Sequence, residues 1–119
     1  MNLVMNSYYK DIYIRNVTTY NAIKLKKKNI EIRLYTPFYQ DIRKYDIISL
    51  IYKKNRLNVY ITDILLFSNI NEIIEDSYIF SNIFPYYSIK ESKQLFNEYY
   101  NEKKQKKYNI VCFCFELVN

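Results

Sequence analysis

The feature that most constrains this chain is that none of its 119 residues is glycine. Glycine adopts left-handed backbone conformations at no steric cost, and phosphate-binding loops, dinucleotide-binding turns and nucleophile elbows all depend on it. The sequence therefore excludes those three kinds of site. Turns that need a positive φ must use a residue with a side chain. Asparagine is among the most tolerant of these, so we expect asparagines at the tight turns.

Histidine is absent as well, and cysteine occurs only at Cys112 and Cys114. Without an imidazole, neither a Ser-His-Asp nor a Cys-His nucleophile system can be assembled. The two cysteines lie two residues apart in a predicted strand, at the limit of disulfide geometry, so we expect free, buried thiols. Too few ligands remain for a zinc site. We expect no metal and no cofactor.

The length of the chain suits one hydrophobic core, so we expect a single domain over residues 1–119. No run of about eighteen apolar residues is present, and we expect no membrane partner. Residues 1–6 lack the charged-then-apolar pattern of a signal peptide, which predicts an intracellular location, cytoplasmic or nuclear. The abundance of Ile, Lys, Asn and Tyr indicates an AT-rich coding genome, such as that of a large DNA virus or a parasite.

The net charge of +6 is spread unevenly along the chain. Residues 1–62 carry 12 basic and 4 acidic side chains, residues 63–102 carry 2 and 7, and residues 103–119 carry 4 and 1. This asymmetry predicts a basic face that attracts polyanions. A lysine-rich solvated surface that reflects codon bias is the alternative, and we interpret the lysines of residues 103–107 in that way.

Hydrophobic periodicity predicts the element order β-α-β-β-β-α-α-β. The predicted strands and helices in the first part of the chain are residues 11–15, 17–25, 29–35, 47–52 and 57–67. We expect Asn16 to cap the first helix and the strand of residues 57–67 to bend near Asp63.

Two capping boxes, Asn69 with Glu72 and Ser88 with Glu91, predict the two later helices. Residues 108–117, apolar on both faces, predict a central strand. Strands outnumber helices, so the pattern favours an α+β fold, a mixed β-barrel with flanking helices, over a doubly wound sheet.

The segment richest in chemistry is residues 24–33, where a helix end passes through a lysine cluster into a strand. Alternation places Glu31 and Arg33 on one face of that strand, away from Ile30. The helix dipole stabilises lysines near a helix C-terminus, and an exposed Glu31–Arg33 pair contributes well under about 1 kcal/mol. A structural role and a ligand site therefore both fit this segment.

The same segment resembles the signature of ASCH domains, which reads Gly-x-Lys-Thr-x-Glu-x-Arg. Lys28, Glu31 and Arg33 match it, Asn29 replaces the threonine, and Lys26 replaces the glycine.

Three further stretches keep the order of the family's motifs: residues 42–50, 59–74 and 88–113. In the first of them, Tyr45 stands in place of a second family glycine. The likeness therefore spans nearly the whole chain.

This resemblance implies a PUA-like β-barrel, related to the PUA, YTH and EVE domains, with a basic cleft at the helix-to-strand junction and a link to RNA. We therefore expect an RNA or nucleotide partner. The predicted binding residues are Lys26, Lys27, Lys28, Asn29, Glu31, Arg33, Tyr35, Lys53, Lys54 and Arg56. The cations suit phosphates, Asn29 and Glu31 suit a base edge, and an exposed Tyr35 beside Arg33 suits stacking.

Two alternatives remain open. Some bacterial ASCH members resemble amidohydrolases of acylated cytidine, and by that likeness a nucleoside hydrolase or RNA-cleaving enzyme would use Lys28 as its amine with Glu31. The region where the distant acid is expected, residues 84–87, holds no carboxylate, so we favour binding without catalysis. The other alternative is a protein-interaction module that has lost the RNA cleft.

Overall fold

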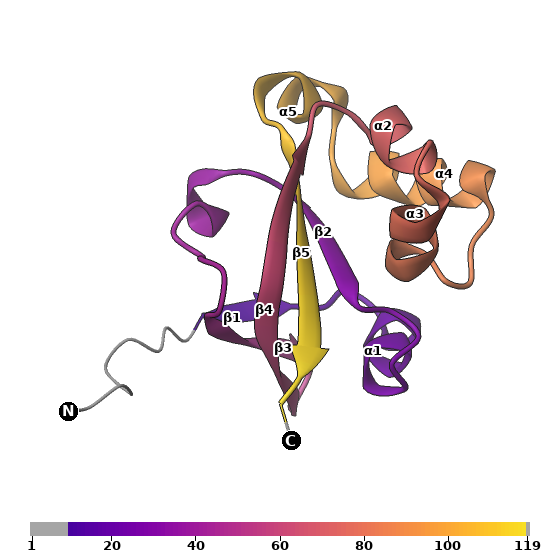
Figure 1. Cartoon of the computed structure of the whole chain (residues 1–119). Coiled ribbons are helices and arrows are strands. Elements are labelled where there is room, and N and C mark those ends of the chain that lie inside the picture. Colours follow the sequence, from indigo (N-terminus) through magenta and orange to yellow (C-terminus); the bar gives the residue numbers. More distant parts are fainter. Residues whose placement is uncertain (1–9, 119) are drawn as a thin grey trace.

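The computed structural model describes residues 10–118 and shows one curled sheet flanked by helices (Figure 1). Residues 1–6, used above for the signal-peptide prediction, lie outside the described part. The sheet has the strand order β1-β3-β4-β5-β2. The strands are β1 (Asp11–Tyr13), β2 (Ile30–Leu34), β3 (Ile47–Tyr52), β4 (Asn55–Phe67) and β5 (Ile110–Leu117). β1 runs parallel to β3, and the other pairs are antiparallel.

Helices flank the curled sheet. They are α1 (Val17–Lys24), α2 (Ile70–Ile74), α3 (Ser77–Ile83), α4 (Ile89–Tyr99) and α5 (Glu102–Lys107), with a 3-10 turn, η2 (Pro37–Tyr39). In Figure 1, α2, α3 and α4 gather beside β2, while α1 and α5 lie at opposite ends of the molecule. The sequence predicted an α+β fold, a mixed β-barrel with flanking helices, and this curled half-barrel sheet with its flanking helices confirms the fold class.

Local sequence signals predicted several helix and strand boundaries correctly. The side chain of Asn16 caps α1 by accepting a hydrogen bond of 2.8 Å from the backbone N–H of Thr19. Both predicted capping boxes are present, at the starts of α2 and α4. β4 carries a bulge next to Asp63, where the bend was expected. β5 is central, between β4 and β2.

The second half of the chain holds four helices among the described residues, where the sequence pattern predicted two. One unpredicted helix is α3, whose first amides donate to the side chain of Asp76. The other is α5. Helix α4 ends before Tyr100, which is extended at φ −132° and ψ 119°, and the chain re-enters a helix capped by Asn101. The predicted element order was wrong at these two points, because short polar side chains start a new helix there.

The tight turns do not use asparagine. The residues with positive φ in the described chain are Lys26 (63°), Tyr45 (78°) and Lys53 (55°), so the expectation of asparagine was wrong. Lys26 and Tyr45 stand where the ASCH motifs have glycine. Each turn is held by backbone hydrogen bonds, from Lys26 N–H to Ile23 O at 3.0 Å and from Tyr45 N–H to Ile61 O at 2.8 Å. The fold therefore keeps both left-handed turns without their glycines, at a cost of about 1–2 kcal/mol each.

The core consists of two clusters on the two faces of the curled sheet. One joins β1, α1, β3, β4 and β5 around the fully buried Phe113, and the other joins β2 and the later helices around Ile73 and Phe96. β2 lies between them, and Ile30, Glu31, Arg33 and Leu34 of this strand are all buried. A strand that alternates in sequence is thus enclosed on both faces, so its charged side chains lie inside the protein.

Candidate functional site

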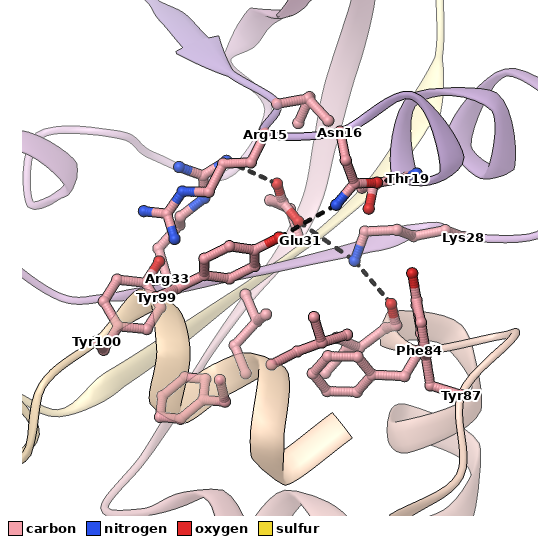
Figure 2. Close-up of a pocket in the computed structure, with 15 residues that line it drawn as sticks. Arg15, Asn16, Thr19, Lys28, Glu31, Arg33, Phe84, Tyr87, Tyr99 and Tyr100 are labelled. Carbon is pink, nitrogen blue, oxygen red and sulfur yellow. Dashed lines mark hydrogen bonds and ion pairs between the residues drawn. The ribbon is translucent and has the colours of Figure 1, made fainter. Parts of the chain in front are cut away.

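A pocket opens beside β2, and we refer to it as the β2 pocket (Figure 2). Its wall carries Lys28, Glu31 and Arg33 from β2 and the turn before it. The β1–α1 junction contributes Arg15, Asn16 and Thr19, and the helical side contributes Phe84, Tyr87, Tyr99 and Tyr100. Its volume of about 70 Å³ is well below the roughly 300–1,000 Å³ of most ligand sites. The pocket is therefore small in this conformation.

Lys28 directly precedes β2, and its ammonium group is buried. Its Nζ donates to the carbonyl oxygens of Ile30 at 2.7 Å and Ile83 at 2.8 Å, and lies 3.2 Å from Oε1 of Glu31. These three acceptors match the three donors of an ammonium ion. Burial lowers the pKa of Lys28, and the charge of Glu31 opposes that shift. Since only the protonated amine satisfies all three acceptors, Lys28 is an ammonium ion that ties β2 to the end of α3.

Glu31 lies between two cations. Its Oε2 lies 2.9 Å from Nη2 of Arg33, on the opposite side from Lys28 (Figure 2). Burial alone would raise the pKa of this carboxyl, but the charges of Lys28 and Arg33 outweigh it and lower the pKa to about 2. Glu31 is therefore ionised at neutral pH and holds both cations in place.

Arg33 bridges the two edges of the sheet. Its Nη2 donates to the carbonyl oxygen of Tyr13 in β1 at 2.9 Å, and its Nη1 donates to Oη of Tyr39 at 3.2 Å. Burial would lower the pKa of Arg33, but Glu31 raises it above its ordinary value. β1 and β2 are the outer strands of the sheet, so the guanidinium of Arg33 spans the seam at which the half-barrel curls round.

The rim of the β2 pocket is formed by a stacked arginine. The guanidinium carbon of Arg15 lies 4.3 Å from the ring centroid of Tyr99 and 5.0 Å from that of Tyr100. Nδ2 of Asn16 donates to Oη of Tyr99 at 3.1 Å. Arg15 makes no ion pair with a carboxylate in the described part of the chain. The rim thus combines an unneutralised guanidinium with two aromatic faces.

The other predicted residues of the α1–β2 turn lie outside this pocket. Lys26 and Lys27 are exposed, and Asn29 is half-buried. Lys26, Lys28 and Asn29 line a second hollow of about 290 Å³ against the end of β5, beside Glu116. Lys28 therefore lies in the wall between the two hollows.

Tyr35 was expected to be exposed beside Arg33, and this was wrong. Its side chain is half-buried and packs against the core around Phe113. The tyrosine that contacts Arg33 is Tyr39, from η2. A 3-10 turn is too short to show periodicity in the sequence, so its position over β2 could not be predicted.

The basic turn between β3 and β4 lies away from both hollows. Lys53 and Lys54 are exposed there, and Arg56 forms a surface ion pair of 2.9 Å with Asp11. Neither hollow is lined by any of these three residues. The structure therefore brings Lys28, Glu31 and Arg33 together in one pocket and leaves the second basic turn separate.

The sequence interpretation missed most of the rim: Arg15, Thr19, Phe84, Tyr87, Tyr99 and Tyr100. Asn16 was predicted, but only as a helix cap. These residues come from three segments of the chain, and no pattern within one segment shows that the three meet. The only usable signal was the abundance of tyrosine, which does not distinguish a rim residue from a core residue.

No group of three or more His, Cys, Asp or Glu side chains that could hold a metal lies within residues 10–118. Cys112 and Cys114 are free. Burial raises the pKa of the Cys112 thiol to about 12, so this cysteine is protonated at neutral pH. None of the helices in the same range has the length and apolar character needed to cross a membrane.

The curled mixed sheet and its flanking helices have the fold of a solved ASCH protein. This similarity of fold agrees with the resemblance of the sequence motifs to those of ASCH domains. A mutant of ZmASCH from Zymomonas mobilis has a similar structure, with a TM-score of 0.64 over 93% of this chain and 73% of that one. Only 15% of the aligned residues are identical, so this match shows the fold.

Two other solved structures are similar over almost their full length. The hypothetical protein PH0355 has a TM-score of 0.80 and 29% identity, over 93% of this chain and 100% of that one. Protein PF0455 from Pyrococcus furiosus has a TM-score of 0.75 and 29% identity, over 94% and 99%. No protein-family model and no curated protein sequence matches the chain.

Proposed function

We propose that the protein binds single-stranded RNA or a nucleotide, with one base in the β2 pocket. The observation that carries this proposal is that the three matched residues of the ASCH signature, Lys28, Glu31 and Arg33, converge on one pocket with an aromatic rim. A protein-interaction module that had lost its cleft would be favoured if these side chains pointed away from any hollow, and they do not. Aromatic faces stack on bases of any sequence, which suits single-stranded ligands.

The buried charges act as the wall of the site in this proposal. All three donors of Lys28 are used within the protein, so it has none left for a phosphate. Phosphate contacts fall instead to exposed cations near the pocket, namely Lys26, Lys27 and Arg15. Lys53, Lys54 and Arg56 would contact only a longer RNA, because they line neither hollow.

The first test is the salt dependence of RNA binding. Fluorescence anisotropy with a labelled single-stranded RNA of mixed sequence gives the dissociation constant at about 50 and about 200 mM salt. Three phosphate contacts with a slope near −0.7 each predict a fall in affinity of about 20-fold over that range. Absence of binding at low salt, or an affinity that salt does not change, would contradict the proposal.

Two double variants separate this site from general attraction to a basic protein. K26Q/K27Q removes two charges from the α1–β2 turn, and K103Q/K104Q removes two from α5 at the opposite end of the molecule (Figure 1). We expect K26Q/K27Q to weaken binding about tenfold and to reduce the salt slope by about 1.4. K103Q/K104Q should reduce RNA affinity much less. Equal losses of affinity in the two double variants would show that the lysines of α5 contribute as much to RNA binding as Lys26 and Lys27.

Hydrolysis of a modified nucleoside is a second candidate, favoured by one observation. The amine of Lys28 and the carboxylate of Glu31 lie 3.2 Å apart in the pocket wall, and burial lowers the pKa of that amine. A nucleophilic or basic amine would have to lose its proton and leave one of its three acceptors. Incubating the wild-type protein with acylated cytidine and with short RNA, and resolving the products by chromatography, tests this candidate. Absence of turnover rules it out for those substrates.

A further inference from the structure

The position of Arg15 has a consequence for which ligands the β2 pocket accepts. Its planar guanidinium lies over the ring of Tyr99 at 4.3 Å, and Asn16 holds the hydroxyl of the same tyrosine at 3.1 Å (Figure 2). An arginine plane stacked on an aromatic ring occupies the place that a nucleobase would take on that ring. The pocket is small, about 70 Å³, while this contact is made.

Arg15 is also the cation of the rim that no carboxylate neutralises among the described residues. The two buried cations in the wall, Lys28 and Arg33, are both committed to Glu31. Guanidinium groups bind phosphate oxygens with two parallel hydrogen bonds. Arg15 therefore has two possible partners within reach of the pocket, the Tyr99 ring of its own chain and a phosphate of a ligand.

We propose that Arg15 makes the β2 pocket selective for phosphorylated nucleotides and RNA over free nucleosides. A base that enters the pocket takes the place of the guanidinium on Tyr99, and the guanidinium moves to the phosphate next to that base. A free nucleoside displaces Arg15 from the ring and supplies no new partner for it. A nucleotide also displaces Arg15 from Tyr99, but its phosphate then accepts charge-assisted hydrogen bonds from the guanidinium. This inference rests on the proposed function, and it assigns the discrimination between nucleotides and free nucleosides to the side chain of Arg15.

The test compares four nucleosides with their 5′-monophosphates by isothermal titration calorimetry, for the wild type and for R15A. We expect the wild type to bind at least one monophosphate about tenfold or more tightly than the matching nucleoside. In R15A the affinity for the monophosphate should fall to the level of the nucleoside. The affinity for the nucleoside should rise about two- to fivefold, because a cation–π contact of ordinary strength no longer competes for Tyr99.

A salt titration with single-stranded RNA adds a readout that a purely structural role would not change. R15A should reduce the salt slope by about 0.7, which corresponds to one phosphate contact. R15K keeps the charge without the planar stack and should retain most of the slope. R43A, which removes an exposed arginine outside the pocket lining, is the matched control and should behave as the wild type.

The outcomes separate the two proposals. If the wild type binds no nucleoside, no monophosphate and no RNA, both the proposed function and this inference are overturned. If the wild type binds monophosphates or RNA, and R15A keeps the same preference and the same salt slope, the proposed function stands and the role of Arg15 is overturned. Thermal unfolding of each variant confirms that it is folded before the comparison is made.

Discussion

The ammonium nitrogen of Lys28 lies 3.2 Å from Oε1 of Glu31, and both side chains are at least 93% buried. A buried ion pair is stable only when its remaining hydrogen-bonding groups are satisfied. Here the carbonyl oxygens of Ile30 and Ile83 take the other two donors of Lys28, and Arg33 takes the second oxygen of Glu31. The pair therefore forms part of the wall of the candidate site and also stabilises the fold.

The first prediction concerns the loss of the carboxylate charge. Glu31→Gln leaves the two buried cations, Lys28 and Arg33, without their anion, so we expect the free energy of unfolding to fall by about 3–5 kcal/mol. Urea unfolding followed by circular dichroism measures it. Glu116→Gln, an exposed glutamate of β5, is the control and should change stability little. A loss below about 1 kcal/mol for Glu31→Gln would show that the network contributes little to stability.

The second prediction is a dependence of stability on acid. The pKa of Glu31 is about 2 in the folded protein and near 4.5 when the chain is unfolded, so the folded state binds this proton less well. A carboxyl with a lowered pKa stabilises the fold above its unfolded pKa and loses that contribution as the pH falls through the folded value. A pKa shift from 4.5 to about 2 corresponds to about 3 kcal/mol in the free energy of unfolding.

We therefore expect the unfolding free energy to decline between about pH 5 and about pH 2, after other carboxyls are accounted for. Urea unfolding at several pH values measures the decline. The same series on Glu31→Gln should be flatter by about 3 kcal/mol over this window. Parallel curves for the two proteins would mean that Glu31 does not carry the acid sensitivity.

The sequence predicted the sheet well and the later helices poorly. Alternation and apolar runs together identified all five strands, and the Asn16 cap and both capping boxes placed three helix starts. The helix α3 was missed because its start depends on the single side chain of Asp76. The break at Tyr100 was missed because the residues on both sides of it favour a helix.

For the site, the ASCH signature identified Lys28, Glu31 and Arg33, but alternation alone did not indicate their burial. A polar face of a strand is expected to meet water, and the face of β2 that carries these residues meets the later helices and the seam with β1 instead. The rim depends on tertiary contacts between the β1–α1 junction and the end of α4. No periodicity within either segment reveals such contacts.

The third prediction restores a family glycine. Lys26 has φ 63°, so Lys26→Gly removes the steric cost of a side chain in the left-handed region. The unfolded chain gains entropy from a glycine, which offsets part of that gain. We expect the free energy of unfolding to rise by about 0.5–1 kcal/mol, measured by urea unfolding.

Lys27→Gly is the matched control for this substitution, since the neighbouring residue does not have a positive φ. It loses the same charge and the same side-chain length, and it should lower stability by about 0.4–1 kcal/mol. Equal changes in the two variants would show that the left-handed turn at Lys26 stores no strain.

The last prediction tests the aromatic rim of the proposed RNA site. Tyr99 is 41% exposed, so Tyr99→Ala removes a stacking surface with little loss of core packing. Base stacking on an aromatic ring is worth about 1–3 kcal/mol, and we expect RNA affinity to fall by roughly 5- to 150-fold. Tyr99→Phe keeps the ring and loses only the hydrogen bond from Asn16, so it should bind RNA nearly as well as the wild type. Tyr78→Ala removes a tyrosine that is 69% exposed on α3 and lines neither hollow, and it should leave the affinity unchanged. Anisotropy titrations of the three variants distinguish stacking at Tyr99 from a general effect of surface tyrosines. Only stacking at this ring predicts that Tyr99→Ala binds RNA more weakly than both other variants.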